Sequence, residues 1–208
     1  MSHIDVKIPS EHTICGKRYI GESSIYFLHP TRKQRIVLSV MIDLYPPTKG
    51  RLMKNLHIQS LIDKWQEVFD KQWSKCDGVK KREIILNGNT TYDQSMKEEQ
   101  QNYKKKRSSK PWSPFHKDII RTIYFYGYWG SLTEPPCSDE VTYRILLEPF
   151  YISKQQLLQL QSILFNQVDD QCKRTSVHYK GSVARPLQDQ TNRPMWKCTN
   201  ENFERDPN

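Results

Sequence analysis

The sequence lacks any run of 18 apolar residues, so we expect no helix that spans a membrane. Residues 1–5 have no apolar core of the kind found in secretory signal peptides, and they give no support for secretion. No recognised nucleic-acid-binding module is present either, although Lys and Arg outnumber Asp and Glu by 32 to 23 in 208 residues. These absences indicate a soluble or peripheral basic protein and leave its compartment open.

Cysteine is sparse and odd in number, and the five residues are Cys15, Cys76, Cys137, Cys172 and Cys198. They stand too far apart along the chain to resemble a zinc ribbon. A bridge between Cys172 and Cys198 is one option, but connectivity cannot be derived from a sequence alone. Otherwise we expect unpaired, buried thiols.

Positive charge is concentrated in two runs, at residues 79–82 and 103–110. Such runs attract nucleic acid, anionic lipid or acidic protein surfaces, and a solvated loop is the plain alternative. Because no nucleic-acid module accompanies them, we expect an acidic protein surface as partner. The candidate partner-binding residues of the second run are Lys104, Lys105, Lys106 and Arg107.

Hydrophobic patterning predicts strands in three parts of the chain. Ser23–Leu44 reads as two strands joined by residues 30–34, with the near-continuous apolar runs of strands that are buried on both faces. Ile119–Trp129 reads as an aromatic strand, and Val141–Leu147 as another.

Apolar residues at helical spacing predict two amphipathic helices, over Met53–Phe69 and Ser153–Phe165. Ser153 is the expected N-cap of the second helix, and Gln156 completes a capping box. Between these helices, residues 70–114 include a long polar stretch that cannot bury enough apolar surface to fold alone. We expect a disordered insertion or a docking arm. Trp73 and Trp112 either anchor a partner or pack beneath the insertion.

Three separated segments carry a family resemblance. Residues 130–137 read Gly-Ser-Leu-Thr-Glu-Pro-Pro-Cys, with Val-Thr-Tyr at 141–143. Residues 9–19 read Pro-Ser-Glu-His-Thr-Ile-Cys-Gly-Lys-Arg-Tyr, and residues 184–193 hold Ala-Arg-Pro-Leu-Gln and a final Asn-Arg. In order and spacing they resemble the Gly-Ser-Leu-Thr-Thr-Pro-Pro-Cys signature, the Pro-Ser-Glu-His turn and the C-terminal motif of the α-type carbonic anhydrases.

The resemblance implies a mixed β fold with peripheral α-helices, built on a large, central, mostly antiparallel twisted sheet. It places a carbonic anhydrase-like domain at residues 1–193, with the insertion at 70–114, and leaves a polar tail at 194–208. The family's N-terminal third has no counterpart here. We therefore expect an N-terminally truncated fold. Either the protein is truncated, or its recorded sequence is incomplete, or another chain supplies the missing strands, and a partner chain is favoured because sheet edges are rarely left uncovered.

The resemblance also implies a zinc site made by a His-x-His strand and a Glu-x-His-x-x-His strand, with a fourth position left for water. Counting back from Pro9 puts Asp5 and Lys7 at the first two ligand positions. On the second strand, Ser24 falls at the family's glutamate and Tyr26 at the third ligand. None of the three ligand positions holds histidine, so we expect no metal.

A shift of two residues would offer His3 and Asp5 on one strand face, with Tyr26 as a poor third ligand. Lys7 would put a cation in the site and oppose Zn²⁺. We therefore expect an Asp5–Lys7 or a Lys7–Tyr26 contact to fill the site, and no cofactor.

Other active-site positions keep their residue types. Thr133 matches the family's threonine that orients the zinc-bound hydroxide, and Glu11 matches the carboxylate that accepts that threonine's proton. Glu134 replaces the usual second threonine. Because half-removing a buried hydrogen bond is costly, such remnants have a structural explanation and are not counted as catalytic residues. The expected pocket-wall residues are Leu28, Val37, Leu132 and Tyr143.

The leading hypothesis is a catalytically inactive carbonic anhydrase-like protein that serves as a structural or protein-binding subunit of a larger assembly. The alternative is a zinc-dependent enzyme of reversible CO₂ hydration, with an unusual or incompletely recorded metal site. The two hypotheses differ in metal content, which is directly measurable.

Overall fold

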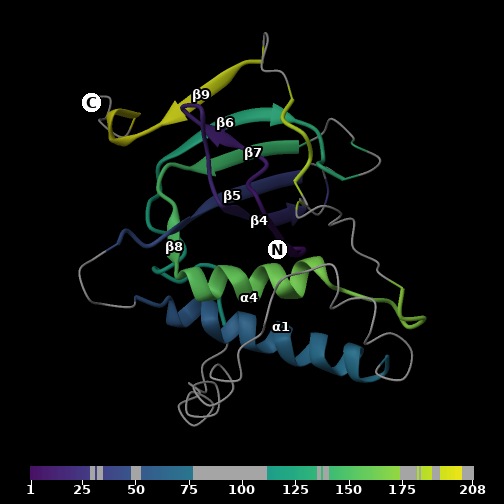
Figure 1. Ribbon diagram of the computed structural model, residues 1–208. Coiled ribbons are helices and arrows are strands. Elements are labelled where there is room, and N and C mark those ends of the chain that lie inside the picture. Colours follow the sequence, from purple (N-terminus) through teal and green to yellow (C-terminus); the bar gives the residue numbers. More distant parts are fainter. Residues whose placement is uncertain are drawn as a thin grey trace.

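The computed structural model describes residues 1–28, 31, 35–47, 53–76, 112–134, 137, 141–173, 182, 184–188 and 193–202. A seven-stranded sheet forms one layer, and two helices, α1 and α4, lie side by side against one face of it (Figure 1). The strands of this sheet are β1 (Ile4–Lys7), β4 (Gly21–Leu28), β5 (Arg35–Leu44), β6 (Phe125–Gly130), β7 (Val141–Leu146), β8 (Phe150–Ile152) and β9 (Met195–Cys198). A separate hairpin pairs β2 (Thr13–Ile14) with β3 (Lys17–Arg18), and a 3₁₀ turn, η2, covers Asn200–Asn202.

The sheet is mixed but mostly antiparallel, in the order β1-β4-β5-β7-β6-β9, with β8 beside β5. Only β5–β7 and β5–β8 are parallel among its described pairs. The expected fold class is therefore confirmed. Within the described residues, β1 and β9 are the outer strands.

The predicted strand pair in Ser23–Leu44 is confirmed as antiparallel β4 and β5. The strand predicted from Ile119 starts only at Phe125, because Ile119 belongs to a turn in which its N–H donates to His116 O at 2.8 Å. Its side chain is buried beneath the helices rather than in the sheet.

The segment predicted as a polar tail contributes a strand. Met195–Cys198 pairs antiparallel with β6, so the sheet extends past residue 193. The indole of Trp196 lies directly over Gly127, where a Cβ atom would be 2.2 Å from the indole carbon Cε2. This aromatic ring packs closely on Gly127 where β9 pairs with β6.

Helix α1 (Leu56–Ser74) begins after Asn55, whose side-chain oxygen accepts the N–H of Ile58. It runs five residues beyond the predicted end at Phe69, so the first residues of the expected insertion are helical. Helix α4 (Lys154–Phe165) has the predicted capping box of Ser153 and Gln156. Neither described helix is long and apolar enough to cross a membrane.

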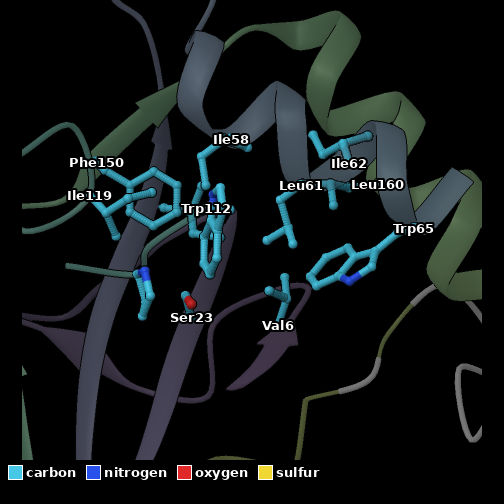
Figure 2. A pocket seen from close by; sticks show the side chains of 12 residues that line it. Val6, Ser23, Ile58, Leu61, Ile62, Trp65, Trp112, Ile119, Phe150 and Leu160 are labelled. Atoms are coloured by element: carbon cyan, nitrogen blue, oxygen red, sulfur yellow. The ribbon is translucent and has the colours of Figure 1, made fainter. Parts of the chain in front are cut away.

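The two helices and the sheet enclose the main core. Ile62, Leu160 and Ile163 of the helices pack against Val40 and Ile42 of β5. A small cavity of about 20 Å³ lies under α1. Figure 2 shows the side chains of the helices, the sheet and Trp112 that surround it. This volume matches about one water molecule.

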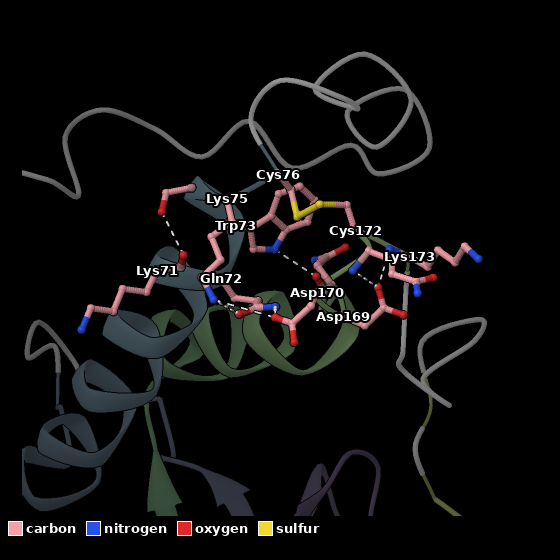
Figure 3. Close-up of a disulfide and its surroundings, with 12 residues drawn as sticks. Lys71, Gln72, Trp73, Lys75, Cys76, Asp169, Asp170, Cys172 and Lys173 are labelled. Carbon is pink, nitrogen blue, oxygen red and sulfur yellow. Dashed lines mark hydrogen bonds and ion pairs between the residues drawn. A yellow bond between two sulfur atoms is a disulfide. The ribbon is translucent and has the colours of Figure 1, made fainter.

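A disulfide joins the C-terminal end of α1 to the turn after α4 (Figure 3). Cys172 is bonded to Cys76, with the two Cα atoms 5.6 Å apart, so the option of a Cys172–Cys198 bridge is wrong. Cys76 is buried, but it is not the free thiol that we expected. The prediction failed because α1 was expected to end at Phe69, whereas its longer course carries Cys76 to the end of α4. Cys15, Cys137 and Cys198 are free.

Candidate functional site

Strands β1 and β4 carry polar side chains on the sheet face that points away from the helices. Val6 and Ser23 border the cavity under α1, so the alternate residues lie on the other face. The register sets Asp5 opposite Ser24 and Lys7 opposite Glu22. The polar side chains of the two strands thus lie together on one face.

His3 joins this group from the start of the chain. Its carbonyl oxygen accepts the N–H of Tyr26 at 3.0 Å, and the two rings stack with centroids 4.3 Å apart. His3 Nε2 lies 3.8 Å from Asp5 Oδ2. The structure therefore assembles the shifted His3, Asp5 and Tyr26 set that the sequence offered as an alternative.

Lys7 forms an ion pair at this site that the sequence analysis did not predict. Its Nζ atom lies 2.6 Å from Glu134 Oε1, so the expected partners Asp5 and Tyr26 are not the ones that Lys7 bonds. Burial opposes the charge of Lys7 and is the largest single influence on its pKa, but the hydrogen bond to Glu134 together with attraction to the carboxylates of Glu11, Glu134 and Asp5 raises the pKa of the lysine. A cation is thus held at one of the expected ligand positions.

The buried carboxylate of Glu22, on β4, holds the neighbouring turn by hydrogen bonds. Its side chain is fully buried, one carboxylate oxygen accepts the N–H groups of Glu11 and His12 at 3.0 Å, and the other lies 2.7 Å from His12 Nδ1. His12 Nε2 lies in turn 2.6 Å from the hydroxyl of Tyr128. Burial penalises both charges, yet their attraction lowers the pKa of Glu22 and raises the pKa of His12.

This arrangement offers a second assignment of the second strand. Glu22 is the only carboxylate on β4, so it is a candidate for the glutamate of the Glu-x-His pattern beside Ser24. Under that assignment the third ligand position would be Ser24, directly opposite Asp5, in place of Tyr26. Ser24 bonds to neighbours instead, with its Oγ 3.3 Å from Glu22 Oε1 and from Ser39 Oγ. The signal was visible in the sequence as Glu22-x-Ser24, two residues before the position we counted.

The expected remnants lie beside this face. Glu11 Oε1 accepts the backbone N–H of Arg185 at 2.9 Å, and burial raises the pKa of Glu11. The hydroxyl of Thr133 is close enough to lower the pKa of both Glu11 and Tyr26. Thr133 Oγ1 is nevertheless buried without a well-formed hydrogen bond to any described residue. The contact between Thr133 and Glu11 therefore falls short of regular hydrogen-bond geometry, although it still lowers the pKa of Glu11.

The expected wall residues divide into two groups. Val37 and Tyr143 are buried in a small cluster with Tyr26, against which Leu132 packs. Leu28 is 58% exposed and lines only the rim of a hollow of about 300 Å³. The hollow is thus lined by a mixture of polar and apolar side chains, including those of His3, Tyr26 and Thr133.

The donors on this face do not fit a zinc ion. Burial raises the pKa of Asp5 and of Tyr26, which disfavours the anionic forms that bind metals. Lys7 adds a positive charge beside them. Across the part of the chain that the structure describes, no three His, Cys, Asp or Glu side chains gather as a metal-binding group.

The aromatic candidates for partner binding are engaged inside the molecule. Trp73 donates its indole N–H to Asn166 O at 3.0 Å, and Trp112 donates to His57 O at 3.1 Å. Both side chains are partly buried, and the prediction that they pack beneath the insertion concerns residues 77–111, which lie outside the described residues. The basic candidates Lys104, Lys105, Lys106 and Arg107 lie outside the described residues.

The sheet, its helical cover and the turn held by Glu22 define the α-carbonic anhydrase class of fold. A family model described as eukaryotic-type carbonic anhydrase matches residues 5–199, and the chain belongs to this family. Among curated relatives, carbonic anhydrase 7 of Mus musculus is 44% identical over 48 residues, which are 23% of this chain and 18% of that protein. Mitochondrial carbonic anhydrase 5A of Homo sapiens is 35% identical over 80 residues, covering 37% of this chain and 25% of the relative.

Solved structures share the fold at low sequence identity. The α-carbonic anhydrase of Thermovibrio ammonificans in complex with sulfanilamide matches with a TM-score of 0.54 at 20% identity, over 92% of this chain and 60% of that chain. Dioscorin complexed with ascorbate matches with a TM-score of 0.58 at 18% identity, over 93% of this chain and 59% of that chain. The chain thus spans about 60% of the solved structures and a smaller part of the curated relatives.

Proposed function

We propose that this chain is a non-catalytic member of the carbonic anhydrase family that serves as a protein-binding or structural subunit. The observation that supports the proposal is the Lys7–Glu134 ion pair, which is 2.6 Å long. Lys7 is one of the positions at which the resemblance to the family implies a zinc ligand. Asp5 and Ser24 stand at the neighbouring positions and offer no imidazole.

The physical argument concerns the nucleophile. Hydration of CO₂ at neutral pH requires a bound water whose pKa is brought down to about 7, and carbonic anhydrase is itself the reference example of this chemistry. A partly buried ammonium repels a divalent cation, and a serine hydroxyl is a poor zinc ligand. Without a metal, Thr133 and Glu11 have no hydroxide to orient.

The alternative, a zinc-dependent CO₂-hydrating enzyme, has one observation in its favour. His3 Nε2 and Asp5 Oδ2 are 3.8 Å apart on the same face. An imidazole and a carboxylate supply two ligands, but Tyr26 is the nearest third donor and its pKa is raised. This alternative predicts about one zinc per chain in the unaltered protein.

Two matched triple variants test the site. Asp5→His/Lys7→His/Ser24→His places three imidazoles on the face that Glu22 defines, and we expect it to bind about one Zn²⁺. Asp5→His/Lys7→His/Tyr26→His carries the same number of histidines at the positions first read from the sequence. Isothermal titration with Zn²⁺ compares both variants with the unaltered chain.

The outcomes separate the two parts of the account. Zinc binding by the Ser24 variant alone supports the assignment of the vacated site, and tighter binding by the Tyr26 variant contradicts it. Zinc binding by the unaltered chain, with CO₂ hydration, contradicts the proposed function and favours the alternative.

The partners that we propose are proteins, since the basic composition is not accompanied by a nucleic-acid-binding module.

A further inference from the structure

An aromatic patch lies on the sheet face that α1 and α4 cover only in part. Leu146 of β7 is buried in the core beneath the helices, and Arg144, two residues earlier on the same face, is exposed. The helical cover therefore ends between these two residues. Gly127 of β6 lies opposite both Arg144 and Trp196 of β9, so these residues share one face with Trp129. We call Trp129, Trp196 and Arg144 the aromatic patch.

The patch belongs to the face of the sheet and not to one of its edges. Strand β6, which carries Trp129, has β7 on one side and β9 on the other, and β7, which carries Arg144, lies between β5 and β6. Both residues therefore stand on strands that are paired along both sides. The hydrogen-bonded ladder fixes their spacing, so the patch is a rigid surface.

The two indole rings of the patch form an open wedge. Three ring atoms of Trp196 lie at nearly the same distance, 2.2, 2.3 and 2.5 Å, from the place of a Cβ atom on Gly127, so one face of this ring lies flat on β6. Its other face points away from the sheet. The ring of Trp129 stands beside it, with the two centroids 4.7 Å apart and the ring planes at 54°.

The wedge is open to a ligand. Trp129 is 59% exposed, and neither indole N–H donates a hydrogen bond within the described part of the chain. Leaving this much aromatic surface in water costs free energy, and exposed apolar patches on proteins often mark binding sites. The wedge therefore offers two ring faces for stacking and two N–H groups for hydroxyl oxygens.

Arg144 supplies the charge of the patch. Its guanidinium carbon lies 5.2 Å from the ring centroid of Phe125, and among the described residues no carboxylate pairs with it. A free guanidinium can bind a planar carboxylate through two parallel N–H groups. Lys197, the nearest cation along β9, lies over the ring of Tyr126 on the opposite face of the sheet. The charge of the patch is thus a single guanidinium beside two rings.

We propose that the aromatic patch binds a polysaccharide built from uronic acids, with a sugar ring against Trp129 and Trp196 and a sugar carboxylate on Arg144. Aromatic faces carry partial negative charge, and the C–H groups on one side of a sugar ring carry partial positive charge. A uronic acid unit combines this C–H face with hydroxyl groups and one carboxylate. These are the groups that the two rings, the indole N–H groups and the guanidinium complement.

The charge of the patch separates this ligand from two others. A nucleic acid carries a phosphate at every nucleotide, and its binding sites follow that charge with several Lys and Arg residues. An acidic peptide supplies carboxylates, but its acidic side chains offer no ring to stack on the wedge. The inference goes beyond the proposed function and does not rest on it, because the face that holds Lys7 is the other side of the sheet.

The test is a titration of the full chain with tetragalacturonate at about 0.15 M salt, where charges farther apart than about 8 Å are screened. Binding is followed by tryptophan fluorescence and by isothermal titration calorimetry. Because two of the five tryptophans lie in the patch, we expect a saturable change in fluorescence. The methyl ester of the same oligomer keeps the rings and loses the charge. It should bind on the order of tenfold more weakly or worse.

Matched variants locate the binding surface. Trp129→Ala and Arg144→Gln should each weaken binding of tetragalacturonate on the order of tenfold. Lys197→Gln removes the same charge from the opposite face of the sheet, and Phe115→Ala removes a 53% exposed ring beside Phe27 of β4. Both control variants should bind as the unaltered chain does. Circular dichroism checks that all four variants are folded.

Several outcomes would overturn the proposal. The folded, unaltered chain could show no saturable binding, Trp129→Ala could leave binding unchanged, or Lys197→Gln could weaken it as much as Arg144→Gln does. Tetraglutamate supplies carboxylates without sugar rings, and a short oligothymidylate supplies bases with phosphates. Tighter binding of either than of tetragalacturonate would assign the patch to an acidic peptide or to a single-stranded nucleic acid. None of these results depends on zinc, so the proposed function is tested separately.

Discussion

The disulfide between Cys76 and Cys172 is expected to be the largest single covalent contribution to stability in this chain. The two residues are 96 apart in sequence, and their bond ties the end of α1 to the turn after α4. In the chain-entropy model, closing a loop of about 100 residues is worth about 4.7 kcal/mol, and loss of a native disulfide typically costs about 2–5 kcal/mol. For a chain of this size, 1 kcal/mol changes Tm by roughly 2–4 °C. We therefore predict a fall in Tm of about 4–20 °C on reduction, with the chain-entropy value of about 4.7 kcal/mol giving the upper half of that range.

The neighbouring contacts do not replace the bond. Trp73 bonds to Asn166 O, and Gln72 Nε2 donates to Asp170 Oδ1 at 3.0 Å across the same junction (Figure 3). The second of these contacts is exposed, and exposed polar contacts contribute about 0–1 kcal/mol. Once Cys76 is released, the end of α1 is held mainly by the packing of Trp73.

The assay is thermal unfolding followed by circular dichroism, with and without reductant, for the unaltered chain and the Cys76→Ser variant. Cys15→Ser is the matched control, since Cys15 is exposed and free and its loss should leave Tm unchanged. Thiol titration in denaturant should find three free thiols before reduction and five after it, because two of the five cysteines are bonded. An unchanged Tm while the thiol count rises from three to five would refute the reasoning.

Three further predictions concern the buried network and the edge strand. Pairing lowers the pKa of Glu22 from its ordinary 4.5 and raises the pKa of His12 from its ordinary 6.5. The stabilisation that the Glu22–His12 pair gives the fold is therefore lost as pH falls below about 4.5. It is also lost as pH rises above about 6.5 through the raised pKa of His12. Urea unfolding from pH 3 to 9 should show this window. Glu22→Gln should lower the free energy of unfolding by about 3 kcal/mol at pH 6 and should make it vary less with pH at both the acidic and the alkaline end. A variant whose free energy of unfolding follows pH in parallel with that of the unaltered chain would contradict the pairing. Gly127→Ala should destabilise the sheet, because its Cβ would meet Trp196, but it should cost little in a Trp196→Ala background, as equilibrium unfolding of the double-mutant cycle can show.

Elements whose signals are local were predictable from the sequence. The capping box of Ser153 and Gln156 needs only residues three apart, and its helix was placed within one residue. The end of α1 was not predicted, because the local signals that mark a helix end are missing there. No glycine or proline interrupts the chain between Phe69 and Ser74. The helix continues until Gln72 and Trp73 dock on the turn after α4, which is a tertiary contact.

The site was predicted in part for the same reason. The absence of histidine from the expected ligand positions could be read directly. The sequence contains Glu22-x-Ser24, but only the contacts of the Glu22 carboxylate with the N–H groups of Glu11 and His12 favour this assignment over the one that starts at Ser24. The Lys7–Glu134 pair joins residues 127 apart, and no local pattern encodes that distance.

The measurement that tests the central claim most directly is the zinc content of the full chain, purified in zinc-supplemented buffer and dialysed, with CO₂ hydration assayed on the same sample. The account predicts far less than one zinc per chain and a hydration rate no higher than that of buffer. Stoichiometric zinc with hydration that a chelator abolishes would contradict it, and would point to His3 and Asp5 as the ligands to substitute next.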